Sequence, residues 1–280
     1  MGRLVQMLPE GKPVTGVTSL ENHLYILRDD KRVEQVEVYD INSYRFQRYL
    51  TVPGLGSTSD IVACANNRCA YISDWEHDSI HKIALSDDTV TQWPVNDTPN
   101  GLSLSLRHNV LVTCRHVRKI KEFSTDGQLL YEVVLPDDVV SVWHSVQLSS
   151  GEFVVCQGGC GDPLHRVCLV SYDGQVVKSF GGPKGSSARA MNVPCHLAVD
   201  EHDFIFVVES NSRRVLLLSP SLTFVRYVVS PEQLTSQSLH LDVGRRHLYV
   251  ADRRHLYVAD DDYEVDDDDW TVGHVVVFSV

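Results

Sequence analysis

Residues 153–180 read FVVCQGGCGDPLHRVCLVSYDGQVVKSF, in which short runs of β-forming residues alternate with turn-forming residues. With the apolar run just before them, the runs are Val146–Leu148, Phe153–Val155, Val167–Tyr172 and Val176–Phe180. Asp173-Gly174 separates the last two runs, and this dipeptide is a strong signal for a β-hairpin. The segment is therefore predicted to form a unit of four antiparallel strands.

A burst of β-forming residues that ends in a small or acidic residue returns along the whole chain. Its copies are Leu24–Asp29, Ala70–Asp74, Val110–Cys114, Phe153–Cys156, Ile205–Glu209 and Leu256–Asp260. A spacing of roughly 40 to 50 residues is typical of repeat proteins. Each copy is expected to be one strand of a four-stranded unit. The sequence therefore predicts an all-β, six-bladed β-propeller of four-stranded antiparallel blades.

The chain is expected to be a single β-propeller domain over residues 1–280. The predicted blades cover approximately residues 15–56, 57–99, 100–140, 141–192, 193–234 and 235–280. The sixth unit ends one strand short, after Gly273–Phe278. Because an open edge leaves backbone groups unpaired, the apolar stretch Arg3–Met7 is expected to pair with the C-terminal blade and close the ring.

The stretch NVPCHLAVD at residues 192–200, followed by Phe206–Glu209 and Asn211–Val215, resembles an NHL repeat. NHL repeats build six-bladed propellers, including the propellers of tripartite-motif NHL proteins. The resemblance implies a binding platform and carries no catalytic residue over. It also implies two alternatives, because some of these propellers bind RNA on a basic face and a similar peptide-amidating lyase holds a metal in its central channel.

The composition is that of a soluble globular protein, with 43% hydrophobic and 22% charged residues. The N-terminus lacks the apolar segment of a signal peptide. The seven cysteines are irregularly spaced, which favours reduced thiols and a cytoplasmic location. Cys64 and Cys69 would face each other across a hairpin, where free thiols are favoured and a disulfide is the alternative. A monomer without a membrane partner is expected.

The net charge of −12 disfavours general nucleic-acid binding, but the charges are unevenly distributed. A basic cluster lies between the second and third predicted strands of blade three and contains Arg115, His116, Arg118, Lys119 and Lys121. The same connection in blade six is acidic and contains Asp260, Asp261, Asp262, Glu264 and Asp266–Asp269. Blades three and six lie opposite each other in a six-bladed ring, so one face is predicted to be positive on one side and negative on the other. Solvated loops and, for the acidic run, a calcium site are the alternatives.

Trp75 and Trp143 fall near strand ends on the same predicted face, where aromatic residues often anchor a partner, although packing between blades explains them equally well. The leading hypothesis is a non-catalytic recognition or scaffold module without a cofactor that binds a protein or peptide on this face. The contacts expected are Arg115, Arg118, Lys119, Trp75 and Trp143. Single-stranded RNA bound at the basic cluster is an alternative.

Three histidines lie near the starts of the innermost predicted strands: His144, His196 and His240. Three imidazoles with one open position are the ligand set of a catalytic zinc site. The alternative function is therefore a metal-dependent lyase or hydrolase with a His-lined central channel. Hydrogen-bonded interior histidines are the favoured interpretation, because a shift of one residue turns a strand side chain to the opposite face.

The octapeptide RRHLYVAD occurs twice in tandem, at residues 245–252 and 253–260. One copy must form the second strand of blade six. Because the copies are identical, no local feature decides which copy does so.

Overall fold

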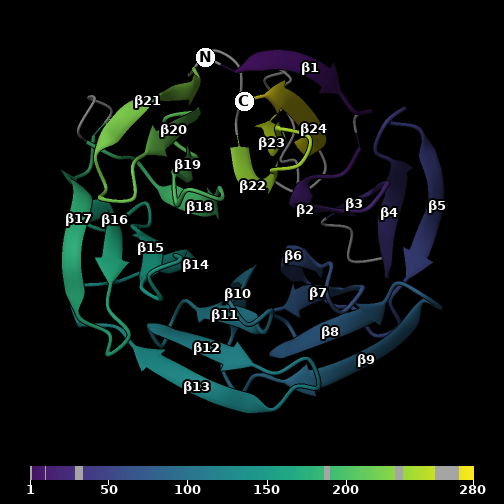
Figure 1. The fold of residues 1–280 in the computed structure, drawn as a ribbon, viewed down its shortest axis with the longest axis horizontal. Coiled ribbons are helices and arrows are strands. Elements are labelled where there is room, and N and C mark those ends of the chain that lie inside the picture. Colours follow the sequence, from purple (N-terminus) through teal and green to yellow (C-terminus); the bar gives the residue numbers. More distant parts are fainter. Residues whose placement is uncertain (1, 10, 29–33, 186–189, 231–235, 256–270) are drawn as a thin grey trace, which may run out of the picture.

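The computed structural model describes residues 2–9, 11–28, 34–185, 190–230, 236–255 and 271–280. In these ranges the regular elements are β-strands, which form six four-stranded antiparallel sheets arranged in a ring (Figure 1). The predicted six-bladed β-propeller is confirmed. No helix within the described ranges has the length and apolar composition needed to cross a membrane.

The first three blades follow one another along the chain. Blade one contains β2 (Val14–Leu20), β3 (His23–Arg28), β4 (Gln35–Asp40) and β5 (Phe46–Thr51). Blade two contains β6 (Thr58–Cys64), β7 (Cys69–Asp74), β8 (Ser79–Ala84) and β9 (Thr89–Pro94). Blade three contains β10 (Pro99–Leu104), β11 (Val110–Cys114), β12 (Lys119–Phe123) and β13 (Leu129–Val134).

The last three blades repeat this order, and the N-terminal strand completes the sixth. Blade four contains β14 (Val142–Gln147), β15 (Phe153–Gln157), β16 (Leu164–Val170) and β17 (Val176–Pro183). Blade five contains β18 (Pro194–Val199), β19 (Ile205–Glu209), β20 (Arg214–Leu218) and β21 (Phe224–Val229). Blade six contains β22 (Ser236–Asp242), β23 (His247–His255), β24 (Thr271–Ser279) and β1 (Arg3–Met7).

The hydrophobic core lies between neighbouring blades. Every residue of β7, β11, β15 and β19 is buried, which explains why these second strands read as continuous apolar bursts rather than alternating patterns. Between blades four and five, for example, Val154 and Val167 pack in one cluster with Leu197 and Val207. The outermost strands are more exposed, since one side of each faces solvent.

The ring closes as predicted, because β1 pairs with β24 in the strand order β1-β24-β23-β22. Arg28 of blade one reinforces this closure. Its guanidinium donates hydrogen bonds to the carbonyl oxygens of Lys12 at 2.7 Å and Gly273 at 2.9 Å, and pairs with Glu37 at 2.9 Å. The side chain therefore ties blade one to β24 and to the segment that follows β1.

The first copy of the tandem octapeptide forms the second strand of blade six. Leu248 and Val250 of β23 pair with Leu241 and Leu239 of β22. The predicted strand Leu256–Asp260 was therefore placed one copy too late, because the identical second copy follows directly. Residues 256–260 and the acidic run, with the predicted calcium site and negative side of the face, lie outside the described residues.

Cys64 and Cys69 face each other across the β6–β7 pair. Both side chains are buried as free thiols, which is the favoured interpretation from the sequence. They pack in the cluster between blades two and three, where Cys acts as a small apolar residue.

Candidate functional site

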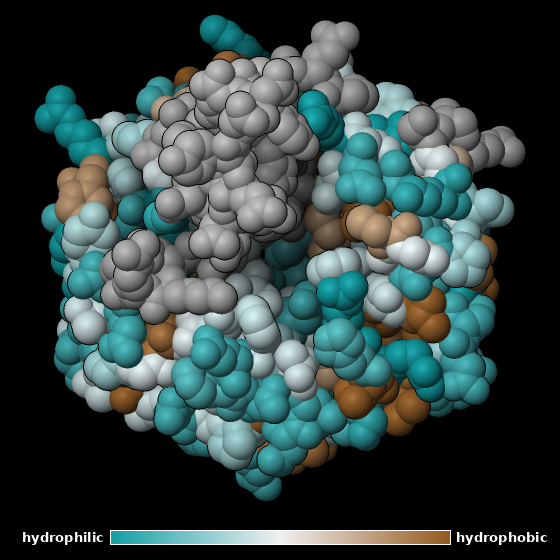
Figure 2. Space-filling view, turned by 180° about the vertical axis from the view of Figure 1, so that it is seen from behind, coloured by the Kyte–Doolittle hydropathy of each residue, from teal (hydrophilic) through white to brown (hydrophobic). Residues whose placement is uncertain are grey.

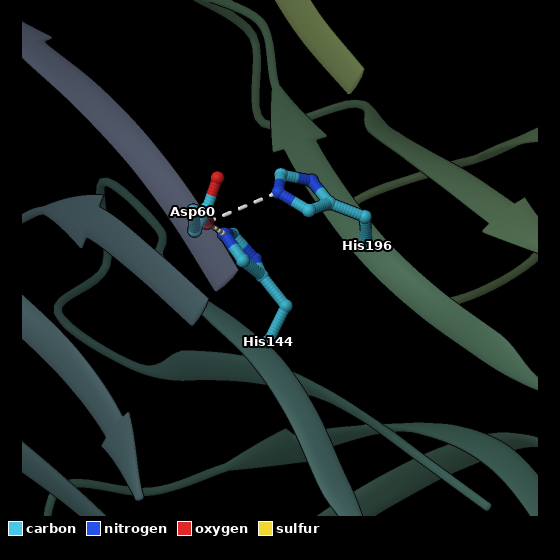
Figure 3. A group of neighbouring side chains, drawn as sticks. All are labelled: Asp60, His144 and His196. Carbon is cyan, nitrogen blue, oxygen red and sulfur yellow. Dashed lines mark hydrogen bonds and ion pairs between the residues drawn. The ribbon is translucent and has the colours of Figure 1, made fainter. Parts of the chain in front are cut away.

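Each innermost strand shows a β-bulge near its start; in every one except β10, where the register shifts between Pro99 and Leu102, the bulge skips one residue. The residues that resume the pairing after it are Gly16, Asp60, His144, His196 and Ser238. These positions are equivalent in the repeat, so the bulges bring side chains from different blades toward the axis of the ring. Three of them, Asp60, His144 and His196, form a buried cluster, which we call the axial cluster (Figure 3).

Asp60 is the centre of the axial cluster. Its Oδ1 accepts a hydrogen bond from the backbone N–H of Ile61 at 2.9 Å, and its Oδ2 accepts one from the backbone N–H of Leu102 at 2.8 Å. The Nε2 atoms of His196 and His144 lie 3.2 and 3.4 Å from the same Oδ2. Burial alone would raise the pKa of Asp60, but the two imidazoles hold it well below its usual value. A single carboxylate thus links β6 to β10, β14 and β18.

The two imidazoles contact each other as well as the carboxylate. Their rings stack with 3.9 Å between centroids. His144 Nε2 also lies 2.9 Å from the carbonyl oxygen of Leu102, which accepts its proton. Burial, and to a lesser degree the neighbouring His196, lowers the pKa of His144, so it is neutral at pH 7. The Nδ1 atoms of both rings are buried and have no hydrogen-bond partner among the described residues.

Gly101 of β10 makes room for the axial cluster. A Cβ at this position would lie 2.5 Å from Cδ2 of His144 and 2.7 Å from the carbonyl oxygen of Trp143. Any larger residue would therefore force the His144 ring or one of the two strands to move.

The structure does not bring His240 into the axial cluster. Ser238, not His240, occupies the position equivalent to His144 and His196, so His240 lies two residues, or about 7 Å, further along its strand. Its Nε2 is 2.8 Å from Ser19 Oγ, and burial lowers its pKa to about 4. The predicted set of three histidines is replaced by two histidines and Asp60. Sequence reasoning missed Asp60, although aligning the blade starts Ser59-Asp60, Trp143-His144 and Cys195-His196 would have shown its position.

Cavities lie on both sides of the axial cluster. One, which we call the mouth chamber, has a volume of about 240 Å³ and is lined by the first residues of the innermost strands and the loops before them, including Thr58, Asp60, Asn100, Trp143, His196 and Ser210. The other has a volume of about 280 Å³ and is lined by His144, His196, His240 and mainly apolar residues. Figure 2 shows one face of the ring, which is largely hydrophilic and hollowed near its centre.

Two of the five predicted contact residues contact each other, and one of them, Trp143, lines the mouth chamber. The guanidinium carbon of Arg115, in the turn between β11 and β12, lies 3.5 Å from the ring centroid of Trp143. The indole Nε1 of Trp143 donates a hydrogen bond to the carbonyl oxygen of Gly158 at 3.1 Å, which fixes the ring. The Arg115–Trp143 stack is therefore a cation–π pair held against the loop after β15.

The other three predicted contact residues are placed differently. Arg118 pairs with Asp137 at 2.6 Å, and Lys119 pairs with Glu132 at 2.9 Å. Arg118 and Lys119 are thus each paired with a carboxylate of their own blade or of the loop that follows it. Trp75 is exposed in the turn after β7.

The fold and the site define a class of protein, a six-bladed β-propeller with a buried Asp–His–His cluster near its axis. No family model and no curated protein matches the chain. The resemblance to NHL repeats therefore stays a resemblance of sequence motifs, while the six-bladed propeller that it implies is observed.

Solved structures share the fold. A streptogramin B lyase is similar over 99% of this chain and 97% of its own, with a TM-score of 0.64 and 12% identity. A catalytically inactive virginiamycin B lyase from Staphylococcus aureus, a His-to-Ala variant solved with quinupristin, is similar over 98% of each chain, with a TM-score of 0.61 and 9% identity. The propeller domain of Cps50 (Swd1) from Myceliophteria thermophila is similar over 95% of this chain and 83% of its own, with a TM-score of 0.58 and 10% identity. At these identities the similarity shows the fold alone.

Proposed function

We propose that this protein is a non-catalytic recognition module that binds a protein or peptide across the face onto which the mouth chamber opens. One side chain or chain end of the partner enters the chamber. The observation that carries this proposal is the chamber itself, a recess at the start of the innermost strands with polar residues and Trp143 in its wall. Aromatic residues beside a recess are typical anchors of protein interfaces.

The size of the mouth chamber supports a peptide side chain as the occupant. Its volume of about 240 Å³ is below the range of roughly 300 to 1,000 Å³ that is typical of small-molecule sites. When one side chain of the partner enters the chamber, the rest of the partner contacts the face around it. The propeller fold commonly mediates protein interactions.

The axial cluster is better suited to holding blades together than to catalysis. A general acid or base works best when its pKa lies near the operating pH. The pKa of Asp60 is far below that range, and both of its oxygens accept backbone hydrogen bonds. His144 is buried with a lowered pKa and is bonded to the carbonyl oxygen of Leu102. These bonds join blades two, three, four and five.

The test is capture of partners from lysate on immobilised protein, with and without nuclease. Trp143→Ala is compared with the matched control Phe46→Ala, which removes an exposed aromatic ring from the outermost strand of blade one. The proposal is supported if proteins are still captured after nuclease treatment, and if Phe46→Ala retains these proteins while Trp143→Ala loses them. Partners retained equally by both variants contradict it, and material lost on nuclease treatment favours RNA.

A second candidate function, a metal-dependent lyase or hydrolase, is favoured by one observation. The ligand atoms of Asp60, His144 and His196 all lie within 4.8 Å of one another, and two imidazoles with a carboxylate are a donor set that Zn²⁺ accepts. The fold is shared with lyases, one of which is inactive as a His-to-Ala variant. To bind a metal, His144 Nε2 would have to exchange its bond to Leu102 for the ion.

Metal analysis distinguishes the two candidates. The purified protein is dialysed against Zn²⁺ and then against metal-free buffer, and its zinc content is measured for wild type and His196→Ala. One zinc per chain in wild type and none in His196→Ala would favour the enzyme. A recognition module is expected to retain less than stoichiometric zinc in both forms.

A further inference from the structure

We infer that the group held at the mouth chamber is a carboxylate of the partner peptide, and that Arg115 selects it. This inference rests on the proposed recognition function and adds the chemistry of the bound group. Four features of the described residues carry it: the orientation of Arg115, its lack of an ion pair, the electrostatics of the chamber wall, and the charge of a single guanidinium.

The stack on Trp143 orients Arg115 for binding. The guanidinium is held by its face, at 3.5 Å from the indole centroid. A guanidinium donates hydrogen bonds in its own plane, so stacking on an aromatic ring occupies its face and leaves its N–H edge available. Trp143 is itself held by Gly158 and lines the mouth chamber. Arg115 is thus held, at little further cost in side-chain entropy, against the aromatic ring that forms part of the chamber wall, with its Nη2 atom near Gly159.

Arg115 also lacks the partner that neighbouring cations have. Arg118, Lys119 and Arg166 each pair with a carboxylate at 2.9 Å or less. Among the residues that the structure describes, Arg115 has no ion pair within 4.0 Å. The nearest acidic influence is Asp162, whose carboxylate accepts a hydrogen bond from the backbone N–H of Gly159. A half-buried cation without a pair favours binding of an anion.

The chamber wall does not repel an anion. The negative charge of Asp60 is already compensated by two backbone N–H groups and two imidazoles. His196 also lines the chamber and directs its Nε2 toward Asp60. The hydroxyls of Thr15 and Thr58 lie 3.2 Å apart in the wall and add neutral donors. A carboxylate beside Arg115 therefore meets mainly compensated or neutral groups.

A single guanidinium matches the single charge of a carboxylate. The two N–H bonds of its edge pair with two oxygens of a carboxylate or a phosphate in bidentate geometry, so the number of available cations decides between the two anions. Phosphate groups on peptides are typically recognised by clusters of arginines. Here Arg118, Lys119 and Lys121 are engaged by Asp137, Glu132 and Asp97, so Arg115 is the arginine or lysine of the predicted basic cluster that has no ion pair among the described residues. The carboxylate comes from a Glu or Asp side chain or from the end of a chain.

The test is calorimetric titration of the full chain with four pentapeptide probes of otherwise identical sequence. One carries a central Glu with both ends blocked, one a central Gln with both ends blocked, one a central Gln with a free C-terminal carboxylate, and one a central phosphoserine with both ends blocked. The Glu or the free C-terminal probe is expected to bind at least about tenfold more tightly than the blocked Gln probe, because a hydrogen bond between two charged groups is stronger than one to a neutral amide. The two carboxylate probes distinguish a side chain from a chain end.

The variants assign the effect to Arg115. Arg115→Gln is expected to remove the preference for carboxylate. Arg115→Lys keeps the positive charge but lacks the planar guanidinium, so it is expected to retain part of the preference for carboxylate. Arg118→Gln is the matched control and is expected to leave every affinity within about twofold, because this exposed cation already has an intramolecular partner. Thermal unfolding of each variant checks that the fold is intact.

Each outcome bears on the inference separately from the recognition function. Equal binding of the Glu, free C-terminal and Gln probes, or no binding of any probe, overturns the carboxylate inference, and so does tightest binding of the phosphoserine probe. A carboxylate preference that persists in Arg115→Gln overturns the role of Arg115. The recognition function is judged independently, by the loss of captured partners with Trp143→Ala.

Discussion

The imidazoles of His144 and His196 stack at 3.9 Å between ring centroids with 29° between their planes, although the two residues come from different blades. Both Nε2 atoms point to the same oxygen of Asp60, which belongs to a third blade (Figure 3). Two imidazoles this close cannot both be protonated without strong repulsion. The cluster is therefore a buried polar junction whose stability depends on the charge of Asp60.

Replacing Asp60 by Asn is expected to destabilise the whole ring. The amide keeps the shape of the side chain but removes the charge that the two imidazoles and two backbone N–H groups compensate. Removing one member of a buried charged network typically costs about 3 to 5 kcal/mol. Urea unfolding monitored by tryptophan fluorescence would measure the loss. Asp137→Asn, which removes the exposed partner of Arg118, is the control and is expected to change stability by less than about 1 kcal/mol. Equal stability of both variants would show that the junction contributes little.

Gly101→Ala is expected to disturb the axial cluster by steric contact alone. The new methyl group would lie 2.5 Å from Cδ2 of His144, so the ring or the strand must move. Overpacking of this kind typically costs about 1 to 3 kcal/mol. Gly161→Ala is the matched control, because a Cβ there meets nothing within 4 Å. Thermal unfolding of the two variants side by side checks the prediction, and equal midpoints would contradict it.

Stability is expected to fall as the pH is lowered from about 6.5 to 4. Burial lowers the pKa of His240 to about 4, whereas an unfolded His has a pKa of about 6.5. Between these values the unfolded chain binds a proton that the folded chain does not, so the free energy of unfolding rises with pH. The contribution of neutral His240 to the free energy of unfolding is fully present above pH 6.5. About 3 kcal/mol of it is lost on reaching pH 4, at about 1.4 kcal/mol per pKa unit. The pKa of His144 is also lowered by burial, so His144 likewise makes the free energy of unfolding fall as the pH is lowered.

The measurement is urea unfolding at several pH values between 7 and 4, for wild type, His240→Gln and His77→Gln. His240→Gln is expected to flatten the pH dependence. His77 is the opposite case, because Asp74 raises its pKa, so its contribution is present below pH 6.5 and lost as the pH rises. His77→Gln is therefore expected to steepen the acid loss. An unchanged slope in His240→Gln would contradict the assignment.

Arg28→Ala is expected to weaken the closure of the ring. It removes the hydrogen bonds to Lys12 and Gly273 and the ion pair with Glu37, whose carboxylate keeps the hydrogen bond from the hydroxyl of Tyr39. The carbonyl oxygen of Gly273 keeps its bond from the backbone N–H of Gly11, so the expected cost is that of the lost bonds to a charged group, about 1.5 to 3 kcal/mol. Limited proteolysis is expected to cut near the N-terminus of this variant sooner than in wild type. Arg48→Ala, which removes an exposed pair with Asp88, is the control. Equal cleavage of both variants would contradict a role of Arg28 in closure.

The architecture was predictable because its signal is local and repeated. The apolar bursts at Val110–Cys114 and Ile205–Glu209 became fully buried second strands, since a blade packed on both faces requires apolar residues without alternation. Closure by Arg3–Met7 followed from counting strands, because an open edge is unfavourable. The strand of blade six was misplaced, because the two copies of RRHLYVAD have equal local preferences and pairing with β22 decides between them.

The axial cluster was only half predictable. His144 and His196 were expected near the channel, but whether His240 joined them depended on a register that one bulge controls. Asp60 carried no local signal, because an aspartate near a strand start is common in turns. Among the basic residues, the sequence could not separate Arg115 from Arg118, since the difference lies in Trp143 and Asp137, which come from elsewhere in the chain.

The sequence alone determined the number of blades, the strands that are buried on both faces and the way the ring closes, because apolar periodicity and strand count are properties of the chain in order. Only the tertiary structure decided which side chains meet near the axis, since residues as distant as Asp60 and His196 are brought together by the ring and by the bulge in each innermost strand. The physical reason is that strand formation depends on neighbours along the chain, whereas a shared carboxylate or a cation–π pair depends on register between blades.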